Sequence, residues 1–476
     1  MYKNVLGRNG INGAGGSTYA RVHYGNTFDN AFYSDSCACM TYGDGNTRYT
    51  YTALDVAAHE FTHGITSATA KLIYSQESGG LNESTSDIFG AVTEFYSRGA
   101  GGTGPTVPQT GGTWTQGEQL VIPGSGVNRQ RYLYKPSLDT RSADAWSPTL
   151  KNLDVHYSSG PMNRAFYFMS MGATASGDTS SSYLPGGMTG IGIDKAARIY
   201  YRALTTYMTP STDYAAARIA VITAARDLYT TGSPEEIAVW SAFAAINVGG
   251  VWAGPDAPPT VAASTTGTAG TITFSANASD DKGIAKVDFY VDGLLVGTDT
   301  ASPYAVPFDS TLEDDGAHTL LARATDTVGF FANSSMTFTI ANGQLLKNAS
   351  FEKGYGVGWS NTNGMQIGAI LNTPSFDGTK AAKFRGMGSA GSVSLFQTVS
   401  IPANATSVAL SYALWIQTQE SSTGVRDTFT VQLRNTAGTL LTTVASYSNL
   451  NSSASYQSYT FDLAAYKGQT VQVYFT

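Results

Sequence analysis

The segment His59-Glu60-Phe61-Thr62-His63 decides how the first half of this chain is interpreted. It lies within residues 52–72, which contain no proline and one glycine, and where apolar residues recur three and four positions apart. This pattern predicts a helix. Residues four apart on a helix lie about 40° apart around its axis, so both imidazoles face one side. They are therefore placed to bind one tetrahedral Zn²⁺.

Glu60 lies one residue beyond His59, about 100° further around the helix. That position is beside the metal rather than on it, where a carboxylate suits a general base acting on water. The motif has only three fixed positions, so chance also produces it and its surroundings must support it. The chain has five histidines, and two of them fall in this motif.

A catalytic zinc needs a third protein ligand and keeps one position open. Glu83 follows His63 by 20 residues and lies in a second predicted helix, at about residues 81–96. A helix–loop–helix is long enough to bring this carboxylate back to the motif. Asp87, one turn later, is suited to accept the second ring N–H of His59 or His63.

Two alternatives for the zinc site are weaker. The metzincin pattern requires Gly and His at positions that Thr66 and Thr69 occupy here. A zinc aminopeptidase would need an anchor for the substrate amine, and the sequence offers none that we identify.

Composition restricts the class of protein. Charged residues make up 13% and aromatic residues 12%, a balance typical of folded domains. A net charge of −7 provides no basic surface for nucleic acid. No apolar run approaches the roughly 20 residues of a membrane helix. The two cysteines, Cys37 and Cys39, can pair only if the backbone turns between them, because an extended strand holds their Cβ atoms too far apart.

Periodicity changes along the chain. Strands and loops are expected in the first 50 residues. Helical patterns recur at about 160–174, 192–208, 212–229 and 234–246, and Ser233-Pro234 provides a helix start. Alternating patterns follow, with a hairpin signal at Asp292-Gly293. We predict a first domain over 1–252, a linker over 253–260, and β domains over 261–341 and 342–476.

The chain resembles the thermolysin-type zinc peptidases, in which a downstream glutamate is the third ligand, over roughly residues 2–250. The resemblance implies an α+β domain with a β-rich N-terminal lobe and a helical C-terminal lobe, holding one catalytic zinc. The matching motifs, in order, are His59-Glu60-Phe61-Thr62-His63, Leu72-Ile73-Tyr74, Glu77-Ser78-Gly79-Gly80 and Asn82-Glu83 through Asp87-Ile88-Phe89-Gly90.

The resemblance also implies roles for residues outside the motif. Tyr74 and His156 match the pair that stabilises the tetrahedral oxyanion, and Asp154 would orient His156. Asn30-Ala31 matches the edge strand that binds substrate backbone, and Arg131 matches an arginine that contacts substrate carbonyls.

Calcium is a further implication of the resemblance. Asp55, Glu94 and Glu118 match the calcium carboxylates of the family. Two positions that often carry acids are Ala91 and Thr113 here. Ca²⁺ prefers six to eight oxygen ligands, so the number of ions stays open.

The family normally has roughly 80 further residues before this segment, so we expect an N-terminally truncated chain that lacks its signal peptide and propeptide. Residues 261–341 resemble bacterial immunoglobulin-like β-sandwiches. Residues 342–476 faintly resemble jelly-roll accessory or carbohydrate-binding domains, in which Trp359 and Trp415 are candidates for stacking on sugars but are more often core residues.

The predicted function is that of a secreted, monomeric metalloendopeptidase acting on peptides and proteins. Its C-terminal domain would bind a polysaccharide or a cell-surface ligand. The alternative is a catalytically impaired surface-binding protein with a degenerate or truncated peptidase domain.

Overall fold

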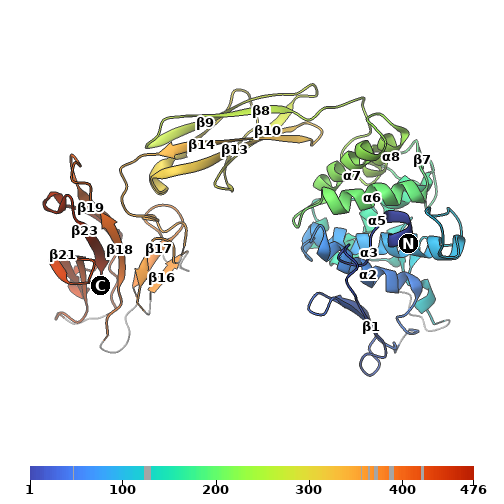
Figure 1. Cartoon of the computed structure of the whole chain (residues 1–476), viewed down its shortest axis with the longest axis horizontal. Coiled ribbons are helices and arrows are strands. Elements are labelled where there is room, and N and C mark those ends of the chain that lie inside the picture. Colours follow the sequence, from blue (N-terminus) through green and yellow to red (C-terminus); the bar gives the residue numbers. More distant parts are fainter. Residues whose placement is uncertain are drawn as a thin grey trace. The chain divides into compact units, whose positions relative to one another are not determined.

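The computed structural model describes residues 1–46, 48–122, 130–354, 356–362, 365–368, 374–384, 391–419 and 423–476. The chain forms two compact units (Figure 1). The first unit comprises residues 1–257 and 327–330, and the second comprises 258–326 and 331–476. None of the described helices is long and apolar enough to cross a membrane.

The first unit is α+β, as the sequence predicts. Its helices are α1 (Tyr2–Leu6), α2 (Leu54–Ala68), α3 (Gln76–Gly99), α4 (Val155–Ser158), α5 (Gly160–Met171), α6 (Ile193–Thr206), α7 (Tyr214–Leu228) and α8 (Pro234–Ala245). Its strands are β1 (Ala20–Arg21), β2 (Ala31–Ser34), β3 (Cys39–Tyr42), β4 (Thr115–Gln116), β5 (Arg131–Tyr132), β6 (Gly172–Ala173) and β7 (Met188–Thr189).

The first strands form a small sheet in the order β1-β3-β2, so β2 is an edge strand. The short helix α1 was not expected among the first 50 residues. Five residues are too few for a helical period to show. Tertiary contacts hold this helix, since Tyr2 is buried and its hydroxyl lies 2.8 Å from Thr62 Oγ1 on α2.

Helix α3 begins at Gln76, five residues before the predicted start at Leu81. The glycine pair Gly79-Gly80 argues against a helix by propensity but is needed for packing. A Cβ atom on Gly79 would lie 2.4 Å from Val155 Cγ1, and one on Gly80 would lie 2.5 Å from Ser158 Oγ. The glycines therefore allow α4 to pack directly on α3.

The later helices begin and end within a few residues of their predicted positions. At the start of α8, the Ser233 hydroxyl accepts a hydrogen bond from the Glu236 backbone N–H at 3.2 Å. This contact satisfies one of the free N–H groups of the first turn. The buried faces of α3 and α5–α8 form the main apolar core of the unit.

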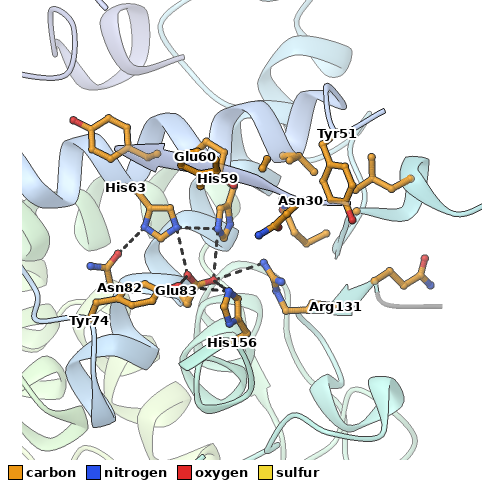
Figure 2. Close-up of a pocket in the computed structure, with 18 of the residues that line it drawn as sticks. Asn30, Tyr51, His59, Glu60, His63, Tyr74, Asn82, Glu83, Arg131 and His156 are labelled. Carbon is orange, nitrogen blue, oxygen red and sulfur yellow. Dashed lines mark hydrogen bonds and ion pairs between the residues drawn. The ribbon is translucent and has the colours of Figure 1, made fainter. Parts of the chain in front are cut away.

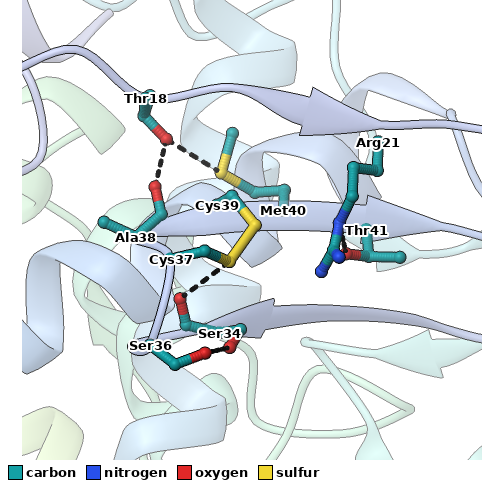
Figure 3. Close-up of a disulfide and its surroundings, with 9 residues drawn as sticks. All are labelled: Thr18, Arg21, Ser34, Ser36, Cys37, Ala38, Cys39, Met40 and Thr41. Atoms are coloured by element: carbon teal, nitrogen blue, oxygen red, sulfur yellow. Dashed lines mark hydrogen bonds between the residues drawn. A yellow bond between two sulfur atoms is a disulfide. The ribbon is translucent and has the colours of Figure 1, made fainter.

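Cys37 and Cys39 form a disulfide at the tip of the hairpin that joins β2 to β3 (Figure 3). Ala38 has φ 48°, so the backbone turns and the two Cα atoms come within 5.2 Å. This is the turn that the sequence requires for pairing. Thr18 Oγ1 donates to Ala38 O at 2.5 Å, and Ser67 Oγ on α2 donates to Asp35 Oδ1 at 2.5 Å. The hairpin tip is therefore tied to its neighbours on both sides.

The second unit begins with two antiparallel sheets, in the orders β11-β10-β13-β14 and β12-β9-β8. Asp292 and Gly293 both have positive φ, 49° and 87°, as a tight hairpin turn between β10 and β11 requires. The strands are β8 (Thr260–Thr266), β9 (Thr271–Ser279), β10 (Ile284–Val291), β11 (Leu294–Asp299), β12 (Tyr304–Asp309), β13 (Gly316–Asp326) and β14 (Phe331–Ile340).

The last segment is also built of strands, with a five-stranded sheet ordered β15-β18-β23-β20-β21. Trp359 is 7% exposed and donates its indole N–H to Asn348 O, so it is a core residue. The strands are β15 (Ser360–Asn361), β16 (Met365–Gly368), β17 (Ala381–Phe384), β18 (Leu395–Ser400), β19 (Ala409–Leu414), β20 (Thr428–Arg434), β21 (Leu440–Ser448), β22 (Gln457–Asp462) and β23 (Thr470–Phe475).

We predict that the double variant Cys37→Ser/Cys39→Ser is less stable by about 1–2 kcal/mol, because its unfolded chain is no longer restricted by the disulfide. The loss is modest because the disulfide closes a very short loop. The midpoint temperature at which the first unit unfolds should fall by about 2–6 °C, measured by differential scanning calorimetry. A reducing agent should lower the transition of the parent chain similarly and leave that of the variant unchanged. An unaltered transition in the variant would contradict a stabilising role.

Candidate metal centre

Two adjacent helices supply the predicted zinc ligands. Helix α2 presents His59 and His63, one turn apart, and α3 presents Glu83 opposite them (Figure 2). The three side chains line a cavity of about 940 Å³. The same cavity is lined by the predicted residues Asn30, Ala31, Glu60, Tyr74, Arg131 and His156.

The three ligands converge closely. His59 Nε2 lies 3.0 Å from His63 Nε2. Glu83 Oε2 lies 3.5 Å from His59 Nε2, and Glu83 Oε1 lies 3.4 Å from His63 Nε2. One ligand atom from each residue therefore falls within 4.8 Å of the other two.

Hydrogen bonds on the far side of each ring fix its tautomer. His59 Nδ1 lies 2.9 Å from Asp87 Oδ1, and His63 Nδ1 lies 2.8 Å from Asn82 Oδ1. The Asn82 amide donates through Nδ2 to Leu72 O at 3.0 Å, so its oxygen faces the ring and accepts. Each Nδ1 therefore carries the proton, and each Nε2 presents a lone pair to the other.

This donor set fits a zinc ion. Two imidazole lone pairs and the buried Glu83 Oε2, which has no hydrogen-bond partner, all face one point. Acceptors so close together are stable only around a cation. Two imidazoles and one carboxylate, with room for a fourth ligand in the cavity, match the composition of catalytic zinc sites.

Asp87 is fully buried behind the ligands, where three groups bind its carboxylate. Arg131 Nε donates to Asp87 Oδ2 at 2.8 Å, and Asn163 Nδ2 donates to the same oxygen at 2.9 Å. Burial opposes ionisation, but Arg131 and His59 hold the pKa of Asp87 well below its ordinary value. Asp87 is therefore a carboxylate that fixes His59, and Arg131 is anchored by it at the wall of the cavity.

Glu60 lies at the wall of the cavity and is 6% exposed. Burial raises the pKa of Glu60, while His59 and His63 oppose the shift and Glu83 adds to it. A carboxylate with a raised pKa is a stronger base than an exposed one, as general-base chemistry requires.

Tyr74 and His156 lie on the opposite side of the ligands from α2. The Tyr74 hydroxyl donates to Glu83 Oε1 and lies 3.5 Å from His156 Nε2. His156 Nδ1 lies 2.8 Å from Asp154 Oδ1, which also caps α4 by accepting from the His156 backbone N–H. Asp154 therefore directs Nε2 toward the cavity, 3.6 Å from Glu83 Oε2.

Sequence reasoning gave no role to Asn82 or Asn163. Asn82 orients His63, and Asn163 reinforces Asp87. The position of Asn82 immediately before a ligand was a usable signal. For Asn163 on α5 there was none, because its contact with α3 is set by the tertiary packing.

The predicted calcium residues are neighbours, since the hydroxyl of Thr113 contacts both Glu94 and Glu118, and Asp55 lies close enough to Glu118 for the two charges to interact. Among the described residues, the groups of three metal-binding side chains with ligand atoms within 4.8 Å do not include Asp55, Glu94 or Glu118. Thr113 forms hydrogen bonds with two of these carboxylates. Its backbone N–H and its hydroxyl donate to Glu94 Oε2, and its hydroxyl also lies 3.1 Å from Glu118 Oε1. Arg98 pairs with Glu94 at 2.8 Å.

Comparison with known proteins matches residues 1–67 to the thermolysin metallopeptidase catalytic domain and residues 70–248 to the thermolysin metallopeptidase alpha-helical domain. Residues 259–322 match a bacterial Ig domain. The chain is 49% identical over 255 residues to a transglutaminase-activating metalloprotease of Streptomyces mobaraensis, covering 52% of this chain and 32% of that protein. It is 38% identical over 254 residues to bacillolysin of Bacillus cereus, covering 52% of this chain and 41% of that protein.

Among solved structures, the precursor of protealysin, a metalloproteinase from Serratia proteamaculans, aligns with a TM-score of 0.42 and 26% identity. The alignment covers 52% of this chain and 74% of that one. The chain thus spans about a third to two fifths of the length of the two sequence relatives.

We predict that Asp87→Asn weakens zinc binding about 10–100-fold, because His59 loses its charged partner. Competition with a chromophoric chelator measures this affinity. The variant should also be less stable by about 3–5 kcal/mol in urea unfolding, because the partly buried guanidinium of Arg131 loses its fully buried counter-charge. Asp227→Asn, which removes an exposed carboxylate paired with Arg202, is the matched control and should change neither quantity appreciably. Unchanged zinc affinity in Asp87→Asn would refute the orienting role.

Proposed function

Residues 1–248 belong to the thermolysin metallopeptidase family, and from this membership we propose that the protein is a secreted zinc-dependent endopeptidase. The observation that carries the proposal is the convergence of His59, His63 and Glu83 in a cavity that Glu60 also lines. Zinc held by these three residues would supply Lewis acidity toward a substrate carbonyl.

The base in this proposal is Glu60. Its carboxylate takes a proton from the attacking water and later delivers it to the nitrogen of the leaving amine. Burial supports both steps, because a raised pKa makes the carboxylate a better acceptor and leaves the resulting acid able to donate.

The oxyanion that develops on the substrate would be stabilised from the other side of the cavity. The Tyr74 hydroxyl and Nε2 of His156, which lie 3.5 Å apart, are the two groups that would donate to it. Asp154 holds Nδ1 of His156, so the ring keeps its orientation while charge develops. Donors fixed in advance in this way lower the barrier without a reorganisation cost.

Substrate backbone would bind along β2. This strand is at the edge of its sheet, and Asn30 and Ala31, at its start, line the cavity. An edge strand offers unpaired N–H and C=O groups to which an extended peptide adds as a further strand. Arg131, anchored by Asp87, lies within reach of the carbonyl groups of such a peptide.

The Cys37–Cys39 disulfide supports secretion, since disulfides persist in oxidising compartments. A polysaccharide or cell-surface ligand for residues 342–476 stays a prediction. Of its two tryptophan candidates, Trp359 is a core residue, and Trp415 is partly buried with its indole N–H bonded to Ser453 O.

A catalytically impaired surface-binding protein is the competing proposal. It would tolerate loss of the base or of the oxyanion donors. The chain keeps Glu60, Tyr74 and His156 together around one cavity, which favours catalysis.

We predict that Glu60→Gln lowers kcat about 10²–10⁴-fold while zinc stays bound, because only the base is removed. A quenched fluorogenic peptide measures turnover, and metal analysis of the purified full chain measures zinc. Glu235→Gln on α8, outside the cavity, is the control and should keep parental turnover. Turnover by the parent that survives a chelator would refute the proposed function.

We predict that Tyr74→Phe lowers kcat about 10²–10³-fold with a smaller change in KM, because it removes one oxyanion donor and preserves the ring. Steady-state kinetics on the same peptide separate the two constants. A rise in KM at constant kcat would instead assign Tyr74 to ground-state binding.

A further inference from the structure

Lys71 is a charged residue of the cavity wall that the mechanism does not use. It lies three residues after the end of α2, and its exposed side chain lines the cavity together with Asp35 and Ser67. In the sequence, Lys71 lies between α2, which carries His59 and His63, and Tyr74.

The backbone at Lys71 has φ 56°, in the left-handed region. Its N–H donates to Thr66 O at 2.8 Å and so closes the end of α2. Glycine usually fills this helix-ending position, because any other side chain is strained there. A lysine at this point is therefore costly to the fold, and strained residues of this kind concentrate at functional sites.

Among the residues that the structure describes, none supplies a counter-charge to the ammonium group of Lys71. Within the described part of the chain, Lys71 Nζ makes no hydrogen bond and has no carboxylate within 4.0 Å. Asp35, an acid that also lines the cavity, accepts a hydrogen bond from Ser67. Glu60 and Glu83, the other carboxylates of the cavity, face the metal ligands.

The position of Lys71 follows from the contacts of α2 with β2. The Ser67–Asp35 hydrogen bond joins the end of α2 to the end of the β2 strand. A Cβ atom at Gly64 would lie 2.8 Å from the ring of Tyr33, so the two elements are in direct contact there. Lys71 therefore lies at the Tyr33–Asp35 end of the edge strand, where one end of a bound peptide would pass.

We propose that Lys71 is a specificity-determining residue that selects peptides with an acidic side chain at this end of the cleft. The inference rests on the proposed function, because it takes the peptide to lie along β2. The ammonium group supplies the counter-charge for an aspartate, glutamate or other anionic side chain of the substrate. The strain at Lys71 is retained because glycine would carry no charge.

Peptide binding to the full chain carrying Glu60→Gln, a background whose turnover should be about 10²–10⁴-fold slower than that of the parent, tests the proposal. The probes are two fluorescein-labelled peptides of otherwise identical sequence. The acidic peptide has glutamate, and the neutral peptide has glutamine, at the three positions on either side of the expected scissile bond. Fluorescence anisotropy gives the Kd of each peptide. The ratio of the neutral to the acidic Kd should fall about three- to fivefold in Lys71→Gln. The fall should shrink in 0.5 M NaCl, because salt screens an exposed charge pair.

Two further variants make the result specific. Lys151→Gln removes an exposed lysine outside the cavity and should leave the ratio unchanged. Lys71→Gly should lose the same selectivity. It should also raise the midpoint temperature of unfolding of the first unit by about 2–4 °C, because glycine adopts the left-handed backbone conformation of this position without strain.

The outcomes separate the inference from the proposed function. An equal affinity of the parent for both peptides, or a ratio unchanged in Lys71→Gln and Lys71→Gly, overturns the role of Lys71 even if chelator-sensitive turnover is present. If the parent chain shows no turnover but still prefers the acidic peptide in a way that depends on Lys71, the proposed endopeptidase function is overturned and the inference about binding stands.

Discussion

The close approach of α2 and α3 is the constraint on which the site depends. Glu83 faces His59 and His63 only because these helices pack directly against one another. Small residues make this possible. A Cβ atom on Gly90 of α3 would lie 2.9 Å from the backbone oxygen of Asp55 on α2, so a side chain there would push the helices apart. Since ligand positions tolerate only small displacements, the metal centre has its geometry only when the two helices are packed in this way.

Charge balance follows from this packing. Glu83 and Asp87 are one turn apart on a buried helix, and two carboxylates in a low dielectric would repel each other. Arg131 compensates the charge of Asp87 from β5, and His59 on α2 donates a hydrogen bond to the same carboxylate. A zinc ion would complete the balance at Glu83, whose Oε2 has no hydrogen-bond partner in the protein. The polar groups inside this helix pair are thus tolerated as a connected set rather than singly.

The sequence predicted those features that depend on local geometry. Helical spacing placed His59 and His63 on one face, and one further turn placed Asp87 beside Glu83. The hairpin at Asp292-Gly293 and the cap at Ser233 were predictable because the chemistry of each lies in adjacent residues. Features that depend on distant contacts were not predictable. The start of α3 at Gln76 was missed because Gly79 and Gly80 serve contacts with α4, and α1 was missed because Tyr2 is held by a residue on α2. In the predicted calcium set, the i,i+4 pairing of Glu94 with Arg98 follows from helical spacing, but the hydrogen bonds from Thr113 to Glu94 and Glu118 depend on the path of a loop that spacing does not reveal.

The edge position of β2 has a consequence for which proteins such a cleft would cut. A substrate that pairs with β2 must present its own backbone as an extended strand, free of internal hydrogen bonds. Folded proteins rarely offer such segments except at mobile loops and frayed ends. Cleavage of native proteins would therefore be confined to a few exposed points, leaving large fragments, whereas unfolded chains would be degraded throughout. The topology of one short strand would thus make the enzyme sensitive to the folding state of its targets as well as to their sequence.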